Sequence, residues 1–465
     1  RAGSPVREVD LSAYTDFIVK HLGWTADGRQ ARVQIQDRAQ TWLDYSVVGI
    51  RGGKPKVLFR ETTEAWVDSP EDGFDLDNGE FLLFSERDGW RHLYRFDKAG
   101  KVISQVTSGE YEVREVHHID EGISDTAGWI YFTGTAPDNH IAEHLYRVRL
   151  DGSGLERITS ERGHHSVELS PDATMFVDSW SNAEQPTRVA LRTIEGDLIR
   201  WIDTNPVYEL EEFDLTPVRL VQIESDAGPM LEASLLLPPD FDASKTYPVW
   251  FQTYAGPHAP TVRDAWSGNA RDYLLTHMGI VVFRGDPYPA SGKGAKSAWT
   301  AYRQLGVREL EDITDLSEWV TSHPWADAAR VGMQGHSYGG FMTSYAMTHS
   351  TLFRAGIAGA PVTDWHLYDT IYTERYMDTP QANPEGYETT SVVNSAADLH
   401  GRMLLAHGTM DDNVHLENAI DLIGALHRAK KPFDLMMYPG SRHGIRSGHY
   451  GPLQIEFIER WLLGE

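Results

Sequence analysis

A serine between glycines places the strongest constraint on the fold of this chain. Residues 335–339 read Gly-His-Ser-Tyr-Gly, between a strand-like run at 330–334 and a helix-like run at 341–347. A G-x-S-x-G segment in that context predicts a sharp strand-to-helix turn that projects the serine hydroxyl from the end of a sheet. The helix N-terminus behind the serine favours developing negative charge. We therefore interpret Ser337 as a candidate nucleophile.

The composition is that of a globular protein with more than one core. The chain has 465 residues, of which 41% are hydrophobic, and this length predicts two domains. Its formal net charge of −26 argues against nucleic acid as a partner, and it either serves solubility or favours cationic substrates. The absence of cysteine excludes disulfides, thiolate zinc sites and cysteine catalysis. No apolar run reaches the length of a membrane span.

Residues 1–206 carry the pattern of a partial β-propeller. Short alternating runs are separated by Asp-Gly and Asn-Gly turns, and the segment His-Leu-Tyr-Arg at 92–95 recurs at 144–147. A four-stranded blade needs about this spacing, and we count about four blades. Because a closed propeller needs more, we expect an N-terminally truncated chain with exposed strand edges. If a signal peptide was lost with the missing part, an extracytoplasmic location, periplasmic or secreted, is favoured.

Residues 207–465 show a different pattern. Strand-like runs at 249–252, 280–283, 403–406 and 433–437 alternate with helical runs. One predicted helix has an apolar face formed by Leu416, Ala419, Ile420, Ile423 and Leu426. Alternating strands and helices predict a mostly parallel sheet that is covered on both faces. Together with the serine turn, this predicts an α/β-hydrolase domain.

A serine nucleophile needs a base, usually a histidine that is oriented by a carboxylate. In an α/β-hydrolase these residues follow in the order Ser, Asp or Glu, His, each on a loop after a strand. Asp411 follows the run at 403–406, and His443 follows the run at 433–437. Separately, Asp411 is also a candidate cap for a helix that begins near His415, and His443 a surface residue. Their joint order and placement favour a triad of Ser337, Asp411 and His443.

The oxyanion of acyl transfer needs two hydrogen-bond donors. The backbone N–H of Tyr338, directly after the nucleophile, is the expected first donor. Tyr254, at the end of an early strand, is a candidate for the second, although the sequence by itself favours a packing role for this tyrosine. The adjacent histidine pairs at 117–118 and 164–165 point to opposite faces of a strand, so we predict no metal site.

Several segments are similar to dipeptidyl peptidase IV-like serine peptidases of the prolyl oligopeptidase superfamily. These segments are Tyr254–Pro257, Ser337–Gly340, Pro361–Trp365, Tyr372–Met377 and His407–Val414. The similarity is specific across residues 230–465 and weaker before them. It implies an eight-bladed propeller that caps an α/β-hydrolase, with the active site between the two. It also implies no cofactor, peptide substrates and a homodimer.

Carried over by position, the resemblance assigns a role to each candidate residue. Ser337 is the nucleophile, Asp411 the orienting acid, His443 the base, and Tyr254 the side-chain oxyanion donor. The pocket for a proline ring is formed by Val362, Trp365, Tyr368, Tyr372 and Val414. Asn413 binds the substrate carbonyl that precedes the proline. The family's pair of glutamates that recognises the free amino terminus is expected upstream of this chain.

The leading hypothesis is a serine exopeptidase that releases X-Pro or X-Ala dipeptides through an acyl-enzyme. One alternative is an endopeptidase, an acylaminoacyl-peptidase or an esterase on the same scaffold. A second alternative is a non-catalytic protein that binds partners through its propeller surface.

Overall fold

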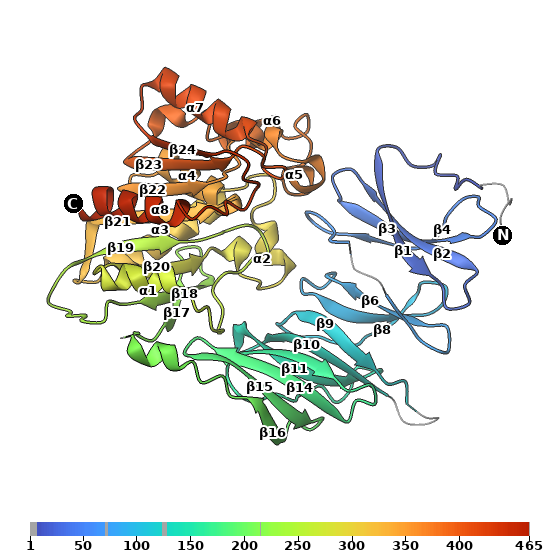
Figure 1. Ribbon diagram of the computed structural model, residues 1–465. Helices are drawn as coiled ribbons and strands as arrows, with labels where there is room; N and C mark the ends of the chain where they lie inside the picture. The colour runs from blue at the N-terminus through green and yellow to red at the C-terminus, as the bar shows by residue number, and fades with distance from the viewer. Residues whose placement is uncertain (1–6, 70–72, 123–127, 214, 465) are drawn as a thin grey trace.

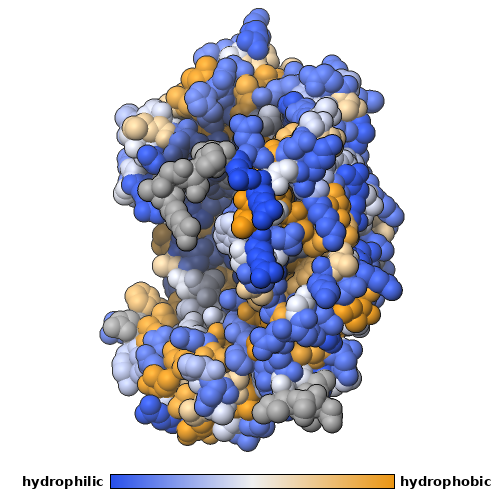
Figure 2. Space-filling view, turned by 90° about the vertical axis from the view of Figure 1, so that its right-hand side faces the viewer, coloured by the Kyte–Doolittle hydropathy of each residue, from blue (hydrophilic) through white to orange (hydrophobic). Residues whose placement is uncertain are grey.

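The computed structural model describes residues 7–69, 73–122, 128–213 and 215–464 (Figure 1). The outer ends of both predicted domains, at residues 1 and 465, lie outside these ranges. In the described part of the chain, no helix has the length and hydropathy that a bilayer span requires. The face in Figure 2 is mostly hydrophilic, and its hydrophobic residues lie in small separate groups, as expected for a strongly charged surface.

The described residues before 204 form antiparallel sheets whose units have four strands each. The first sheet has β1 (Phe17–Trp24), β2 (Gln30–Asp37), β3 (Trp42–Gly49) and β4 (Lys56–Thr62), and the second has β5 (Phe74–Asp75), β6 (Phe81–Ser85), β7 (His92–Phe96) and β8 (Val102–Gln105). The third unit has β9 (Val113–Ile119), β10 (Trp129–Ala136), β11 (Asn139–Arg149) and β12 (Glu156–Arg157), and the fourth has β13 (His164–Leu169), β14 (Met175–Asn182), β15 (Gln185–Thr193) and β16 (Leu198–Asp203). A single parallel residue pair between β11 and β13 joins the last two units into one eight-stranded sheet.

The sequence repeat marks equivalent positions in successive units. His92 Nδ1 lies 3.0 Å from Thr107 Oγ1, and His144 Nδ1 lies 3.0 Å from Thr159 Oγ1. In both units the threonine hydroxyl also accepts from the backbone N–H of the residue after the histidine. Each buried histidine therefore ties the third strand of its blade to the fourth segment, which explains why the motif recurs.

The remaining strands form one eight-stranded sheet. Its order is β17-β18-β20-β19-β21-β22-β23-β24, antiparallel at β17 and β18 and parallel thereafter. The strands are β17 (Arg219–Glu224), β18 (Met230–Leu236), β19 (Tyr247–Gln252), β20 (Val281–Asp286), β21 (Ala326–His336), β22 (Ala355–Gly359), β23 (Arg402–Gly408) and β24 (Asp434–Tyr438). The helices are α1 (Ala270–His277), α2 (Ala295–Trp299), α3 (Val307–Thr321), α4 (Tyr338–His349), α5 (Thr370–Met377), α6 (Pro384–Thr389), α7 (Glu417–Ala429) and α8 (Tyr450–Ile458).

Helices cover both faces of this sheet (Figure 1). The core on one face includes residues of α3, α4 and α7, and the core on the other includes Leu275 of α1 and Phe457 of α8. The predicted apolar face of α7 was partly wrong, because Ile420 is 52% exposed whereas Ala419 and Leu422 are buried. Consecutive helix positions differ by about 100° around the axis, so Ile420 turns away from the sheet when Ala419 faces it.

Ion pairs join the propeller-like sheets to the hydrolase domain. The Arg38 guanidinium, after β2, donates from Nη2 to Glu374 Oε1 on α5 at 2.6 Å. Arg375 Nη1 lies 3.2 Å from Asp68 Oδ1, and His258 Nε2 lies 2.7 Å from Glu112 Oε1. These contacts place the loop after β4 and the start of β9 against α5 and the loop that carries Tyr254.

Candidate active site

Ser337 sits on a strained turn between β21 and α4. Its backbone angles are φ 62° and ψ −120°, a conformation that costs a non-glycine residue about 1–3 kcal/mol. A Cβ on Gly335 would come within 2.3 Å of Gly339, and a Cβ on Gly339 would come within 2.6 Å of the Thr253 carbonyl oxygen. Both glycines of the motif are therefore needed for the turn to close, as the sequence pattern predicts.

Asp411 and His443 are brought together by loops that follow adjacent parallel strands, β23 and β24. His443 Nδ1 lies 2.9 Å from Asp411 Oδ2. Asp411 Oδ1 accepts from the backbone N–H groups of Asn413 and Val414, each at 3.0 Å. This carboxylate is buried and held by backbone donors, so it can fix the orientation and tautomer of the imidazole. It does not cap α7, which begins six residues later at Glu417.

The His443 ring packs against His336, the residue before the nucleophile, with ring centroids 4.9 Å apart. Among the hydrogen bonds of the described residues, none joins the Ser337 hydroxyl to His443. Catalytic hydrogen bonds are often long without substrate and shorten in the Michaelis complex. The present geometry thus joins Asp411 to His443 and leaves His443 beside the turn that carries Ser337, which is called the elbow below.

The Tyr254 side chain lies close enough to Ser337 for the two to interact. Burial raises the pKa of Tyr254, and the interaction with Ser337 opposes that effect only in part. The phenol therefore stays protonated at neutral pH and can donate. Tyr338 is the first residue of α4, where backbone N–H groups have no partner within the helix. These two groups are the candidate donors for an oxyanion at Ser337.

Aromatic rings cluster beside the elbow, at the position where the resemblance expects the proline ring, and this cluster is called the aromatic slot. The Trp365 and Tyr372 rings are stacked, with centroids 6.3 Å apart, and Tyr368 lies edge-on to Tyr372 at 5.2 Å. Tyr338 connects the slot to the nucleophile, because its ring lies 5.6 Å from Trp365 and 6.0 Å from Tyr254. Such walls suit a flat apolar ring without an N–H group.

Of the remaining predicted residues, two are buried beside this cluster and one is exposed. Val362 and Val414 are buried, and both belong to the same core as Trp365. Asn413 is exposed, and its Oδ1 accepts from the Tyr368 hydroxyl at 2.8 Å. This bond from Tyr368 orients the Asn413 side chain and leaves its amide nitrogen able to donate to a ligand.

Two buried residues that contact site residues were not predicted from the sequence. Glu309 on α3 accepts from the Tyr338 hydroxyl at 2.7 Å, and burial raises the pKa of Glu309 to about 7. His407, the sixth residue of β23, lies with Nε2 2.9 Å from the Val414 carbonyl oxygen and 3.3 Å from Asp411 Oδ2. The position of His407 four residues before the acid was a usable signal, whereas nothing local marks Glu309 as a partner of Tyr338.

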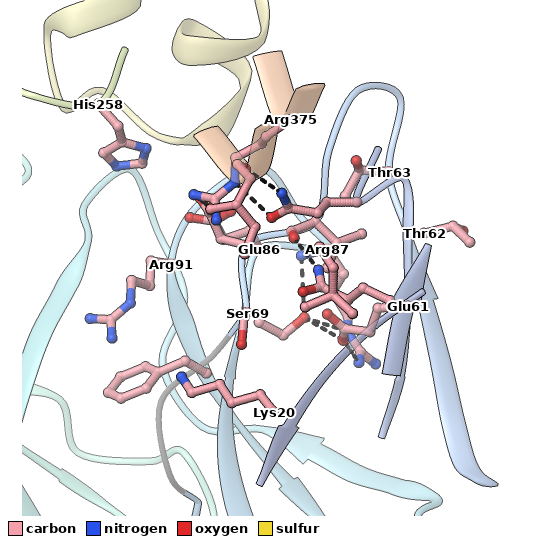
Figure 3. Close-up of a pocket in the computed structure, with 18 of the residues that line it drawn as sticks. Lys20, Glu61, Thr62, Thr63, Ser69, Glu86, Arg87, Arg91, His258 and Arg375 are labelled. Carbon is pink, nitrogen blue, oxygen red and sulfur yellow. Dashed lines mark hydrogen bonds and ion pairs between the residues drawn. The ribbon is translucent and has the colours of Figure 1, made fainter. Parts of the chain in front are cut away.

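A pocket of about 500 Å³ lies between the propeller-like sheets and the hydrolase domain (Figure 3). It borders the aromatic slot, because α5 supplies Tyr372 to the slot and Ile371 and Arg375 to the pocket. Charged side chains from both parts of the chain line it, including Lys20 and Glu61 of the propeller-like sheets and Arg375 of α5 (Figure 3).

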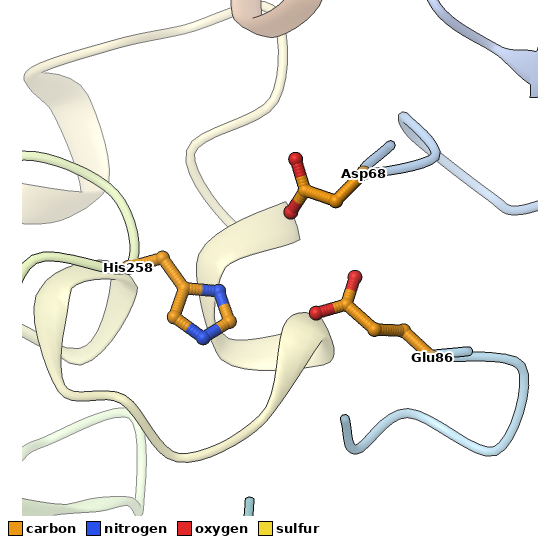
Figure 4. Close-up of side chains that lie close together, drawn as sticks. All are labelled: Asp68, Glu86 and His258. Carbon is orange, nitrogen blue, oxygen red and sulfur yellow. The ribbon is translucent and has the colours of Figure 1, made fainter. Parts of the chain in front are cut away.

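Asp68, Glu86 and His258 meet in this pocket, with ligand atoms within 4.8 Å of one another (Figure 4). They are the group of described residues that could hold a metal ion. Burial and the charge of Asp68 raise the pKa of Glu86 to about 8. Burial alone would lower the pKa of His258, but Glu112 outweighs it and raises that pKa to about 9. The imidazolium and Arg375 therefore supply positive charge to this cluster without a metal ion.

Both parts of the chain match known families. Residues 266–465 match the prolyl oligopeptidase family, and residues 2–187 match the dipeptidyl peptidase IV N-terminal region. These matches confirm the predicted fold class, a propeller-like β region followed by an α/β-hydrolase domain.

Three known proteins give the scale of the similarity. Dipeptidyl peptidase 8 of Mus musculus is 30% identical over 498 residues, which cover 92% of this chain and 55% of the relative. A protein named probable dipeptidyl-aminopeptidase B of Fusarium vanettenii is 30% identical over 475 residues, covering 96% of this chain and 51% of the relative. The crystal structure of Porphyromonas gingivalis dipeptidyl peptidase 4 matches with a TM-score of 0.89 and 28% identity, covering 98% of this chain and 65% of that one. The chain thus spans about half the length of the relatives that it matches in sequence.

Proposed function

Because the chain belongs to the prolyl oligopeptidase family and carries a dipeptidyl peptidase IV-type N-terminal region, we propose that it is a serine exopeptidase that releases N-terminal X-Pro or X-Ala dipeptides. The observation that carries the proposal is the 2.9 Å contact between Asp411 and His443 beside the strained elbow of Ser337. No metal or cofactor is needed for this chemistry, because the three side chains supply nucleophile, base and orienting charge.

The reaction follows from the positions of these groups. The Ser337 hydroxyl attacks the carbonyl carbon of the second substrate residue, and His443 takes its proton. The negative charge on the former carbonyl oxygen is stabilised by the Tyr254 hydroxyl and the Tyr338 N–H. His443 then protonates the leaving amine as the C–N bond breaks, which leaves the dipeptide esterified to Ser337. Water, deprotonated by His443, hydrolyses that ester and restores the serine.

The aromatic slot supports the choice of residue at the second substrate position. Trp365 and Tyr372 offer parallel faces that match a proline ring, and an alanine fits the same space with less contact. Asn413, held by Tyr368, donates to the carbonyl that precedes this residue. Recognition of the free amino terminus is proposed from the family alone.

A pair of dipeptide anilides tests the proposal. An X-Pro anilide with a free amine is expected to be cleaved much faster than the same compound with a blocked amine. Equal rates would instead support an endopeptidase, an acylaminoacyl-peptidase or an esterase. A fluorophosphonate probe is expected to label Ser337, and absence of the label would favour the non-catalytic binding protein. Ser337→Ala is expected to lose about 10⁶-fold in kcat.

We also propose a homodimer, which rests on the family resemblance. Light scattering of the purified chain should give twice the mass of 52.3 kDa per protomer. A mass that stays at one protomer over a wide concentration range would contradict this proposal.

A further inference from the structure

A second pocket, of about 480 Å³, lies on the His443 side of the elbow. Its walls include His336, which precedes the nucleophile, and Gly444 and Ile445, which follow the base. None of the side chains of the aromatic slot lines it. It is therefore separate from the slot that would hold the acyl part of the substrate.

The pocket is built at the carboxyl ends of three neighbouring parallel strands. Gln252, Arg284 and Gln334 end or nearly end β19, β20 and β21, and they are register partners in the sheet. The N-terminal residues of α1 and α8 close the pocket from the covering layer. Both helices thus point their positive dipole ends at it.

The charged side chains that line the pocket are cationic. Arg271 and Arg284 are among its lining residues, which include no aspartate or glutamate. Asp272 lies close behind, but its Oδ2 accepts from Arg284 Nη2 at 3.1 Å and its Oδ1 accepts from Gln252 Nε2 at 2.8 Å. The charge of Arg284 is therefore balanced by Asp272.

Arg271 has no such partner. It donates from Nη1 to the neutral Gln454 Oε1 at 2.7 Å, and it forms no ion pair with any residue that the structure describes. The side chain is partly buried, and burial lowers the pKa of Arg271, although the nearby charge of Asp272 opposes that effect. A partly desolvated cation with a neutral partner gains the most from a carboxylate ligand.

A buried hydroxyl points to the same kind of ligand. Thr253 Oγ1 has no hydrogen-bond partner, although the residue is only 6% exposed and lines the pocket. An unsatisfied buried donor is costly, so this hydroxyl marks a place where an acceptor is missing. Arg271 and Thr253 together offer a cation and a neutral donor, which suits a carboxylate.

We propose that this pocket binds a carboxylate of the leaving peptide, with Arg271 as the residue that determines the preference. The inference rests on the proposed function, because the acyl part occupies the aromatic slot and the amine that His443 protonates departs on the His443 side. The carboxylate comes either from the C-terminus of a tripeptide substrate or from an acidic side chain directly after the scissile bond. Both present the same planar anion to the guanidinium.

Two pairs of substrates separate these sources. The first pair is Ala-Pro-Ala with a free C-terminus and the same tripeptide as the C-terminal amide. The second pair is Ala-Pro-Asp-Ala-amide and Ala-Pro-Asn-Ala-amide. We expect the anionic member of at least one pair to have a kcat/KM about tenfold higher, as for a charge-assisted hydrogen bond. The pair that shows the preference identifies the source, and neutral and anionic members cleaved equally in both pairs would overturn the proposal.

Variants then test the residue. Arg271→Gln should abolish the preference for the anion, and Arg271→Lys should keep part of it because the charge remains. Arg330→Gln is the matched control, since Arg330 lies towards the amino end of β21, paired with Asp327, and should leave the preference unchanged. A preference that survives in Arg271→Gln would exclude Arg271 as its cause.

The anilide substrate distinguishes failure of this inference from failure of the proposed function. Its leaving group carries no carboxylate, so its cleavage by the wild-type protein depends on the triad and the aromatic slot and not on the carboxylate pocket. An anilide that is cleaved, combined with no charge preference in the peptides, rejects the carboxylate pocket alone. An anilide that the wild-type protein does not cleave, with no fluorophosphonate label, rejects the proposed function first.

Discussion

The ion pair between Glu112 and His258 makes the stability of this protein depend on pH in a way that can be calculated. Glu112 precedes β9 in the propeller-like region and is fully buried, and His258 lies in the loop of Tyr254. Burial alone would raise the pKa of Glu112, but His258 and Arg114 hold it at about 2. The pair therefore joins the two parts of the chain close to the active site.

The expected magnitude follows from the two pKa values of His258. Its ordinary pKa is 6.5, and in the folded protein it is about 9. This difference corresponds to about 3 kcal/mol of unfolding free energy. Because the folded state binds the proton more tightly, the contribution is fully present below pH 6.5 and is lost as the pH rises through 9. The free energy of unfolding should fall by up to about 1.4 kcal/mol per pH unit in that window.

Urea unfolding between pH 6 and 10 measures this slope. Glu112→Gln removes the charge, so the variant should be about 3 kcal/mol less stable than wild type near pH 6 and should lack the slope above pH 6.5. Glu86 adds a slope of the same sign below pH 8, since its pKa is raised to about 8. Glu86→Gln removes that part and also reduces the His258 part, because the charge of Glu86 helps to raise the pKa of His258. Glu156→Gln breaks an exposed pair with Arg147 and should change stability by less than about 1 kcal/mol. A wild-type slope in Glu112→Gln would refute the assignment to this pair.

Three further substitutions test the active site with the X-Pro anilide. Asp411→Asn should lower kcat by about 10⁴-fold, because an amide stabilises the wrong tautomer of His443, and a loss below tenfold would speak against the triad. Tyr254→Phe should lower kcat by about 10²–10³-fold at nearly constant KM, whereas a change in KM alone would assign Tyr254 to substrate binding. Trp365→Ala should raise KM and reduce the preference for proline over alanine. Trp365→Ala also removes a fully buried ring, which costs about 3–5 kcal/mol of stability, so a thermal melt must show that the variant is folded. An unchanged preference for proline would show that Trp365 does not bind the proline ring.

The sequence by itself determined the fold class and the line of candidate catalytic residues. Parallel strands in one sheet place their carboxyl ends at one edge, so Ser337, Asp411 and His443 could be assigned to that edge from chain order alone. The 52-residue repeat likewise predicted equivalent strands, because His92 and His144 each bond a threonine at the equivalent position of its own unit. Local sequence patterns are enough to place a residue where the geometry of a single strand, helix or repeat determines its position.

Only the tertiary structure decided which side chains meet across elements. Arg271 and Thr253 share a pocket because β19 and α1 pack at one end of the sheet, and Glu112 meets His258 from a different domain. Even within α7, the periodic pattern wrongly assigned Ile420 to the buried face, because a shift of one residue around the helix decides whether a side chain is buried. Such contacts join residues that are distant along the chain, and no local periodicity carries the position or charge of the partner.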